Sequence, residues 1–352
     1  MTSKVIVGVG AIILACCLVG CTSPESLPGS PTADSSTRST PGSVTEPYLV
    51  PSDRNGDGLI TVGFTDVGPT DGWQEAHEKS YMEYFVEANG FAFVYSDTWF
   101  YYGESSRDVL NWVNEGVEVI VIYHTELVAD WVPVLQVAKD ARVPIIFDSH
   151  LPDVEEDLYL TYFTPDWEGQ GKTAVAWLKD HIAAIGMTDP INILHIQGEI
   201  NSPAHVGRTK ALDEAAVANG WNIVHRLDGG WTRFGGQNAA TAFLASGGQN
   251  MDFNVVFSES DDMTLGALEV FTTAGWDMKP LVIITFDGSK EIVQAIIDGE
   301  VDMVSEYTPY WGPQVGEVIL NAAAGEKIPK ITYTRDGIID STNAAEKLAI
   351  GW

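Results

Sequence analysis

The chain has 352 residues and a formal net charge of −30, from 49 Asp and Glu against 19 Lys and Arg. Its length allows two domains, and its 45% of hydrophobic residues can bury a core in each. So acidic a surface excludes nucleic acid, whose backbone attracts Lys and Arg, and would repel an anionic membrane. We interpret the charge as a solubility property of a domain outside the cell.

The first residues are typical of a signal peptide. Lys4 precedes an apolar run over 5–19, which is short for a membrane-spanning helix. The run ends in Leu18-Val19-Gly20-Cys21, which resembles the bacterial lipobox, where the chain is cut before the cysteine and the thiol receives a lipid. We expect 1–20 to be a lipoprotein signal peptide and Cys21 to carry the lipid, a palmitate-bearing anchor. An ordinary signal peptide or membrane anchor is the alternative.

All three cysteines lie within residues 16–21, so the domain that follows has no thiol for a disulfide, a metal site or a nucleophile. Residues 21–58 are rich in Ser, Thr, Pro and Gly and predict a flexible tether. At its end, Asp53, Asn55 and Asp57 match the first half of a calcium loop, but Phe64 stands where the distal Glu should be. A polar turn is the main interpretation and a weak calcium site the alternative.

From residue 60 onward, predicted strands and helices alternate regularly. Apolar runs and helix-ending glycines mark their limits. The alternation predicts an α/β fold with parallel strands, and its length predicts two sheets. The expected strands are 60–64, 117–123, 145–147, 191–197, 221–225, 254–257, 281–286 and 301–307, and residues 158–163 are a further strand or a crossing segment. The expected helices are 73–89, 105–115, 131–141, 167–185, 208–219, 234–246, 261–274, 289–298 and 311–324.

Polar and aromatic side chains recur where these strands end. Ligands of open α/β sheets bind outside the carboxyl ends of the strands, so we expect these side chains to line one cleft. Carboxylates accept paired hydrogen bonds from vicinal hydroxyls, and an indole covers the C–H face of a sugar ring. For a single acid, helix N-capping is the alternative role. The candidates are Asp71, Trp73, His124, Asp148, Trp231, Ser260, Asp287 and Glu306.

Several segments carry a resemblance over nearly the whole folded part. They are Val62-Gly-Phe-Thr-Asp-Val-Gly with Gly72-Trp73, the stretches 131–139 and 143–148, Ser260-Asp-Asp-Met, Phe286-Asp-Gly288 and Glu306-Tyr-Thr-Pro309. The chain resembles the type I periplasmic sugar-binding proteins of ABC importers, and within them most closely the galactofuranose-binding branch. The resemblance implies two Rossmann-like lobes with parallel sheets, joined by three crossover segments. Lobe one would span 59–162 plus 308–334, and lobe two 163–307 plus 335–352.

The resemblance also implies ligand contacts. Trp73 and Trp231 would be the two aromatic contacts, and Asp148, Asp287 and Glu306 the polar ones at successive strand ends. His124 would match the polar residue after the second strand in ribose-type members. Three positions depart from the family pattern, namely Gln74 and Ser149, where basic residues are usual, and Ser260, where Asn is usual. Thr70, Gln74, Ser149, His150 and Arg208 are lower-ranked candidates.

The resemblance implies a substrate-binding lipoprotein that captures a pentose or hexose monosaccharide, in furanose form in some members, and delivers it to a membrane permease. It implies no enzymatic activity, no cofactor, a monomer, and a lipid-anchored position on the cell membrane facing outside the cytoplasm. Two alternatives stay open from the residues. One is a ligand-binding sensor for a membrane signalling partner. The other is a surface glycoside hydrolase using Asp148 and Asp287 as paired acids.

Overall fold

The computed structural model describes residues 51–66, 68, 72–98, 102–123, 131–188, 190–247 and 252–352. The predicted features at Cys21, Thr70, Asp71 and His124 lie outside these residues. Within them, no helix has the length and apolar character needed to cross a membrane.

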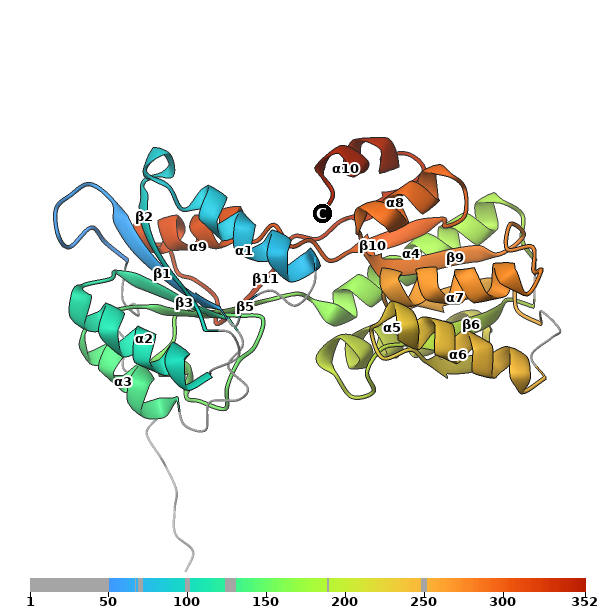
Figure 1. Ribbon diagram of the computed structural model, residues 1–352, viewed down its shortest axis with the longest axis horizontal. Coiled ribbons are helices and arrows are strands. Elements are labelled where there is room, and N and C mark those ends of the chain that lie inside the picture. The colour runs from blue at the N-terminus through green and yellow to red at the C-terminus, as the bar shows by residue number, and fades with distance from the viewer. Residues whose placement is uncertain are drawn as a thin grey trace, which may run out of the picture. The chain divides into compact units, whose positions relative to one another are not determined.

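The first sheet has six strands in the order β11-β5-β4-β3-β1-β2 (Figure 1). All of its neighbouring strands pair in parallel. The strands are β1 (Ile60–Asp66), β2 (Phe91–Asp97), β3 (Val119–Tyr123), β4 (Ile145–Asp148), β5 (Thr161–Thr164) and β11 (Ile331–Tyr333). Its helices are α1 (Gly72–Tyr84), α2 (Tyr102–Glu115), α3 (Val132–Asp140) and α9 (Gly312–Ala323), with short 3₁₀ helices at Glu87–Asn89 and Glu156–Leu158. We call this group lobe one.

The central strands of lobe one are apolar on both faces, which is why the sequence shows continuous apolar runs there. Successive residues of β3 point to opposite faces. Val119 and Val121 pack with α1 and α9, whereas Ile120 and Ile122 pack with α2 and α3. Helices therefore cover both faces of the sheet. The carboxyl ends of the strands are left for a ligand site.

The second sheet also has six strands, in the order β12-β10-β9-β8-β6-β7. All pairs are parallel except β10 with β12. The strands are β6 (Asn192–Gln197), β7 (Asn222–Asp228), β8 (Val255–Ser258), β9 (Val282–Asp287), β10 (Met303–Glu306) and β12 (Ile338–Asp340). The helices are α4 (Trp167–Ala184), α5 (Pro203–Asn219), α6 (Arg233–Ala245), α7 (Asp261–Thr273), α8 (Lys290–Ile297) and α10 (Ala344–Ile350). We call this group lobe two.

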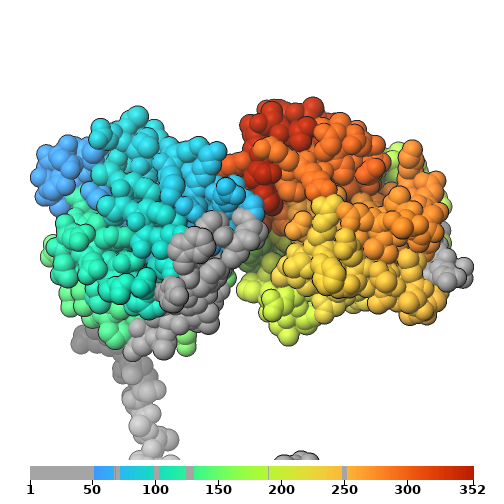
Figure 2. Space-filling view, in the orientation of Figure 1, coloured from blue at the N-terminus to red at the C-terminus, as the bar shows by residue number. Residues whose placement is uncertain are grey.

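Two apolar clusters form the core of lobe two. Residues of α4 and α5 pack on one face of the sheet, and residues of α6, α7, α8 and α10 pack on the other. Figure 2 shows α6 in yellow and α7 in orange forming much of the facing surface of this lobe. The predicted α/β fold with two parallel sheets is confirmed, with an antiparallel edge strand added to the second.

The chain changes sheet at three places. It leaves the first sheet after β5, returns to it after β10, and passes once more to the second between β11 and β12. We keep the residue limits of the two lobes, 59–162 plus 308–334 and 163–307 plus 335–352, as a proposal consistent with these crossings.

Some elements differ from the expectation. Helix α1 ends at Tyr84, and Gly90, with φ of 86°, closes the 3₁₀ turn instead. Helix α5 begins at Pro203, five residues before the predicted start, with Ser202 as its N-cap. Proline is well tolerated in the first turn because its missing N–H would have no helical partner there. The strands β2, β11 and β12 and the helix α10 had no predicted counterpart.

Candidate functional site

A pocket of about 470 Å³ lies where the carboxyl ends of strands from both sheets meet the first turns of the following helices. Its walls are aromatic and polar in similar measure, as in small-ligand sites. It is lined by Gly72, Trp73, Gln74, Tyr123, Ser149, His150, Trp167, Ser202, Pro203, Ala204, Arg208, Trp231, Ser260, Asp261, Asp262, Asp287, Ser289, Tyr307 and Trp352. Both lobes contribute, as expected for a ligand enclosed between them.

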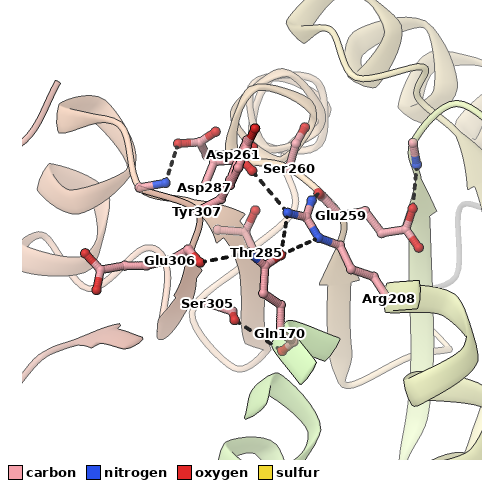
Figure 3. A network of polar contacts seen from close by, with 12 residues as sticks. Gln170, Arg208, Glu259, Ser260, Asp261, Thr285, Asp287, Ser305, Glu306 and Tyr307 are labelled. Atoms are coloured by element: carbon pink, nitrogen blue, oxygen red, sulfur yellow. Dashed lines mark hydrogen bonds and ion pairs between the residues drawn. The ribbon is translucent and has the colours of Figure 1, made fainter. Parts of the chain in front are cut away.

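The guanidinium of Arg208 is the central donor of this pocket (Figure 3). It reaches in from α5, is 2% exposed, and lies 4.3 Å from the ring centre of Phe286. Its Nη2 donates to Gln170 Oε1 at 2.9 Å and lies 3.5 Å from Asp287 Oδ1, while Nη1 donates to the backbone oxygen of Glu259. A guanidinium held this way has a fixed orientation toward the ligand.

Asp287 faces this cation, and a second carboxylate, Asp261, lies near Asp287. Asp261 Oδ2 accepts from the backbone N–H groups of Gly288 at 3.2 Å and Ser289 at 2.7 Å. Burial and the nearby Asp261 carboxylate raise the pKa of Asp287 well above its usual range, although Arg208 opposes the shift. Asp287 also has a φ of 92°, a left-handed conformation unusual for Asp, at the end of β9. The raised pKa of Asp287 allows this pair of side chains to offer acceptors and one donor.

Behind Arg208 lies a second, fully buried carboxylate, Glu259. Its oxygens lie 3.0 Å from His195 Nε2, 2.9 Å from His205 Nδ1 and 2.7 Å from Thr209 Oγ1. Burial alone would raise the pKa of Glu259, but hydrogen bonds from its partners lower it to about 2. The ionised carboxylate ties β6 and β8 to α5, which fixes the backbone oxygen that holds Arg208.

Trp73 sits in the first turn of α1, but its ring faces are largely taken by neighbours. It is 7% exposed and stacks against His77 at 5.0 Å and Tyr307 at 4.4 Å between ring centres. Its Nε1 donates to the backbone oxygen of Tyr307 at 2.9 Å. The indole thus anchors the crossing segment after β10 and presents only a small part of its surface to the pocket.

Trp231 is more accessible and stands in the loop before α6. Its φ of 67° is left-handed, and its backbone N–H contacts Met263 Sδ at 3.3 Å. The indole lies directly on Gly198, where an added Cβ would be 2.0 Å from Cη2, so only glycine fits there. The ring is thereby held against the end of β6, with Arg208 5.9 Å from its centre.

Most described candidates come together in this pocket, and two do not. Asp148 is fully buried, where its Oδ2 accepts from Tyr81 and lies 3.2 Å from His77 Nε2. Glu306 extends away from Arg208 (Figure 3), and its carboxylate binds Lys347 at 2.7 and 2.8 Å. Both carboxylates are absent from the lining described above. The candidates in the lining are Trp73, Gln74, Ser149, His150, Arg208, Trp231, Ser260 and Asp287.

Other residues of the lining had no predicted role. Tyr123 is the last residue of β3, and Trp167 the first of α4, so the strand-end rule could have found both. Asp261 and Asp262 follow Ser260 in a segment already noted for its resemblance. Tyr307 lies in the segment Glu306-Tyr-Thr-Pro309, which was also noted for its resemblance. Nothing in the sequence signals Trp352, because its place depends on how the chain crosses between the sheets.

The loop with calcium-like spacing forms a compact turn before β1. Asp53 Oδ1 accepts from Gly56 N at 2.6 Å, and Asp57 Oδ1 accepts from Leu59 N at 2.9 Å. Asn55 Oδ1 accepts from Asp57 N at 2.8 Å. In the part of the chain that the structure describes, no group of three or more His, Cys, Asp or Glu side chains could hold a metal ion. The arrangement fits the polar turn, and we propose no calcium site.

Comparison with known proteins identifies the family. Residues 68–327 match the family model of the periplasmic binding protein domain. The chain is 28% identical to the galactofuranose-binding protein YtfQ of Escherichia coli (strain K12) over 296 residues, which are 82% of this chain and 90% of that protein. It is 26% identical to the fructose import binding protein FruE of Bifidobacterium longum (strain NCC 2705), over 83% of this chain and 88% of the relative.

A solved structure agrees with these matches. The periplasmic binding protein component of the arabinose ABC transporter from Shewanella sp. ANA-3, bound to α- and β-L-arabinofuranose, superposes with a TM-score of 0.67. The sequences are 25% identical, and the match covers 82% of this chain and 95% of that structure. The relatives are sugar-binding transport proteins rather than enzymes, so paired-acid hydrolysis is not retained. The chain belongs to the periplasmic binding protein domain family, as a type I member of its ribose and galactose branch.

Proposed function

We propose that this protein is the extracytoplasmic sugar-binding component of an ABC importer, which captures a neutral monosaccharide between its lobes and delivers it to a membrane permease. The observation that carries the proposal is the buried Arg208 held between Gln170 and Asp287 in an aromatic pocket. The similarity of the chain to a galactofuranose-binding protein and to a fructose import binding protein supports the proposal.

The pocket chemistry favours a neutral polyol. Asp261, Asp262 and Asp287 supply acceptors for hydroxyl groups, and Arg208 supplies fixed donors. Trp167 and Trp231 supply apolar faces for ring C–H groups. The acidic side chains of the pocket outnumber its single arginine, which disfavours a sugar acid or a sugar phosphate.

The relatives narrow the sugar class. Their printed ligands are galactofuranose, fructose and arabinofuranose, which are pentoses and hexoses, two of them named in the five-membered ring form. We infer that this chain takes a pentose or hexose in furanose form. Contacts would come from Trp231, Ser260, Asp287 and Arg208, with Trp73, Gln74, Ser149 and His150 closing the lobe-one side.

The setting of the domain follows from its first residues. We infer that Cys21 is lipidated after removal of 1–20, which anchors the protein to the cell membrane facing outward. The Ser, Thr and Pro-rich tether would keep the domain near its permease and raise its effective concentration there. Ligand would favour the conformation in which both lobes contact it, because only that form makes all the contacts.

Titration of the purified full-length protein tests the proposal. D-galactose, D-fructose, L-arabinose and D-ribose would each be added while tryptophan fluorescence and the melting temperature are followed. A sugar present at 100 times its Kd should stabilise the fold by about 2.7 kcal/mol. No response to any of the four, together with no response to their furanoside methyl glycosides, would overturn the sugar assignment.

Variants connect the response to this pocket. Trp231→Ala removes a partly exposed ring from the wall and should weaken binding by roughly tenfold or more. Trp177→Phe is the matched control, because Trp177 hydrogen-bonds Asp340 at 3.0 Å outside the pocket. Loss of sugar uptake in cells lacking the gene would support import. Unchanged uptake with a lost transcriptional response to the sugar would favour the sensor instead.

A further inference from the structure

Trp352 follows α10 and is held by contacts from both lobes. Its backbone oxygen accepts from Lys290 N, at the start of α8 in lobe two, at 3.0 Å. Two residues earlier, the backbone oxygen of Ile350 accepts from Tyr310 Oη, on the segment leading into α9 of lobe one, at 2.7 Å. The chain at 350–352 is therefore tied down on both sides, and its last side chain has a defined place.

The indole of Trp352 packs onto lobe one although its backbone is fixed to lobe two. It belongs to the apolar cluster around β1, α1 and α9. A methyl group placed on Gly72, the first residue of α1, would lie 3.7 Å from its Cε3. Figure 1 places the chain end, marked C, beside the first turn of α1 in agreement with this contact.

Trp352 borders two cavities. Trp352 lines the pocket of about 470 Å³ described above and also a smaller cavity of about 220 Å³ beside the crossings. Asp287 is a second residue shared by both. The smaller cavity has Arg335 and the Glu306–Lys347 ion pair in its walls, beside apolar residues such as Ile339. A side chain that borders both spaces can set where the ligand pocket ends.

The indole N–H is the second feature. Nε1 of Trp352 is buried and has no hydrogen-bond partner among the residues that the structure describes. Indole nitrogen can only donate, and an unpaired buried donor is costly. Almost all such groups in native proteins have a partner. A ligand oxygen at this end of the pocket would supply one.

We propose that Trp352 is a specificity-determining residue, whose ring limits the pocket to a single sugar unit and whose N–H donates to a ligand oxygen. This inference rests on the proposed sugar-binding function. It assigns the size limit to one side chain of the α10 segment rather than to the strand-end residues that bind the sugar.

Two substitutions separate the two roles. Trp352→Phe keeps most of the wall but loses the donor, so monosaccharide affinity should fall about tenfold while disaccharides stay excluded. Trp352→Ala also opens the smaller cavity, so the variant should gain saturable binding of lactose or sucrose that the natural protein lacks. The monosaccharide probe is whichever of D-galactose, D-fructose, L-arabinose and D-ribose gives the strongest response with the natural protein.

The controls keep the outcomes distinct. Trp177→Phe should alter neither specificity nor affinity, and melting curves show whether each variant is folded. Unchanged monosaccharide affinity in Trp352→Phe would overturn the donor role. A crystal structure of Trp352→Ala that still shows two separate cavities, or continued exclusion of both disaccharides, would overturn the wall. If the natural protein binds none of the sugars, the proposed function fails, whereas the crystal structure still decides whether Trp352 is the partition.

Discussion

At the scale of single residues, the site depends on one carboxyl group in an unusual environment. Asp287 lies 3.5 Å from Arg208 and close to Asp261, in a left-handed backbone conformation. Burial and the negative neighbour both favour its protonated form. A protonated carboxyl can donate to a sugar oxygen, which an ionised one cannot.

The raised pKa predicts how stability depends on pH. In the unfolded chain the pKa of Asp287 would be about 3.9, so below that pH the side chain is protonated in both the folded and the unfolded state. Above it the unfolded state loses the proton while the folded state keeps it, so the free energy of unfolding falls as pH rises toward the folded-state pKa. Asp287→Asn cannot ionise, so it should gain stability relative to the natural protein as pH rises above about 4 toward the folded-state pKa of Asp287.

Urea unfolding at several pH values measures this difference. Asp180→Asn removes a charge from an exposed position of α4 and should run parallel to the natural protein. Parallel curves for Asp287→Asn as well would contradict the assigned environment.

Residue identity could be predicted from the sequence where a strand end dictates it. Trp231, Ser260 and Asp287 were candidates on this ground, and all three line the pocket. Arg208, which also lines it, was a lower-ranked candidate that came from the family resemblance. The direction of a side chain was not predictable, because it depends on neighbours from other elements. Glu306 stands at a strand end yet turns to Lys347, which lies 41 positions further along the chain.

At the scale of elements, glycine sets how closely the helices of lobe two pack. Gly266 of α7 faces the backbone of α6, where an added Cβ would lie 2.1 Å from Arg233 O. Gly236 of α6 meets Met263 O of α7 at 2.2 Å in the same way. The two helices therefore touch backbone to backbone, which brings Trp231, before α6, and Asp261, at the start of α7, into the lining of one pocket.

A methyl group in this contact should separate the helices. Gly266→Ala is expected to lower the free energy of unfolding by about 1–3 kcal/mol and to weaken sugar binding. Gly103→Ala is the matched control, since Gly103 lies in α2 with nothing within 4 Å of its added Cβ. That change should stabilise by up to about 1 kcal/mol, because alanine favours helix more than glycine does. Chemical denaturation and sugar titration of both variants test the contrast, and equal effects would contradict it.

The order and type of most elements could be predicted because apolar runs and helix-ending glycines mark them. The first and last residues of the elements were harder to predict. Helix α5 begins at Pro203, and a proline can either begin a helix or precede one. Helix-interior glycines such as Gly266 carry no sign in the sequence of the partner that they approach. The edge strand β12 and helix α10 depend on contacts with a distant sheet.

At the scale of the whole molecule, one carboxylate joins the segments that cross between the lobes. Asp336 Oδ2 accepts from Thr334 Oγ1 at 2.7 Å and from Gln170 Nε2 at 3.0 Å. Its Oδ1 accepts from Thr308 N at 3.3 Å. These partners lie on or beside the three crossings, and Gln170 also holds Arg208. The crossings and the ligand pocket thus share one hydrogen-bond network.

Removing this carboxylate should uncouple the lobes. Asp336→Ala leaves Thr308 N without its acceptor, at a cost of about 1–3 kcal/mol for a buried unpaired group. It also leaves Gln170 Nε2 with only the longer contact to the backbone oxygen of Glu306 at 3.3 Å. We expect calorimetry to change from one unfolding transition to two, because each lobe has its own core while their link is weakened. Sugar affinity should fall as well, since Gln170 no longer fixes Arg208.

Asp336→Asn retains one carbonyl acceptor and should recover part of both losses. Asp277→Ala, an exposed change outside the crossings, should leave a single transition. One unshifted transition in Asp336→Ala would show that the lobes are coupled by their aromatic contacts, such as Trp73 with Tyr307, rather than by this network.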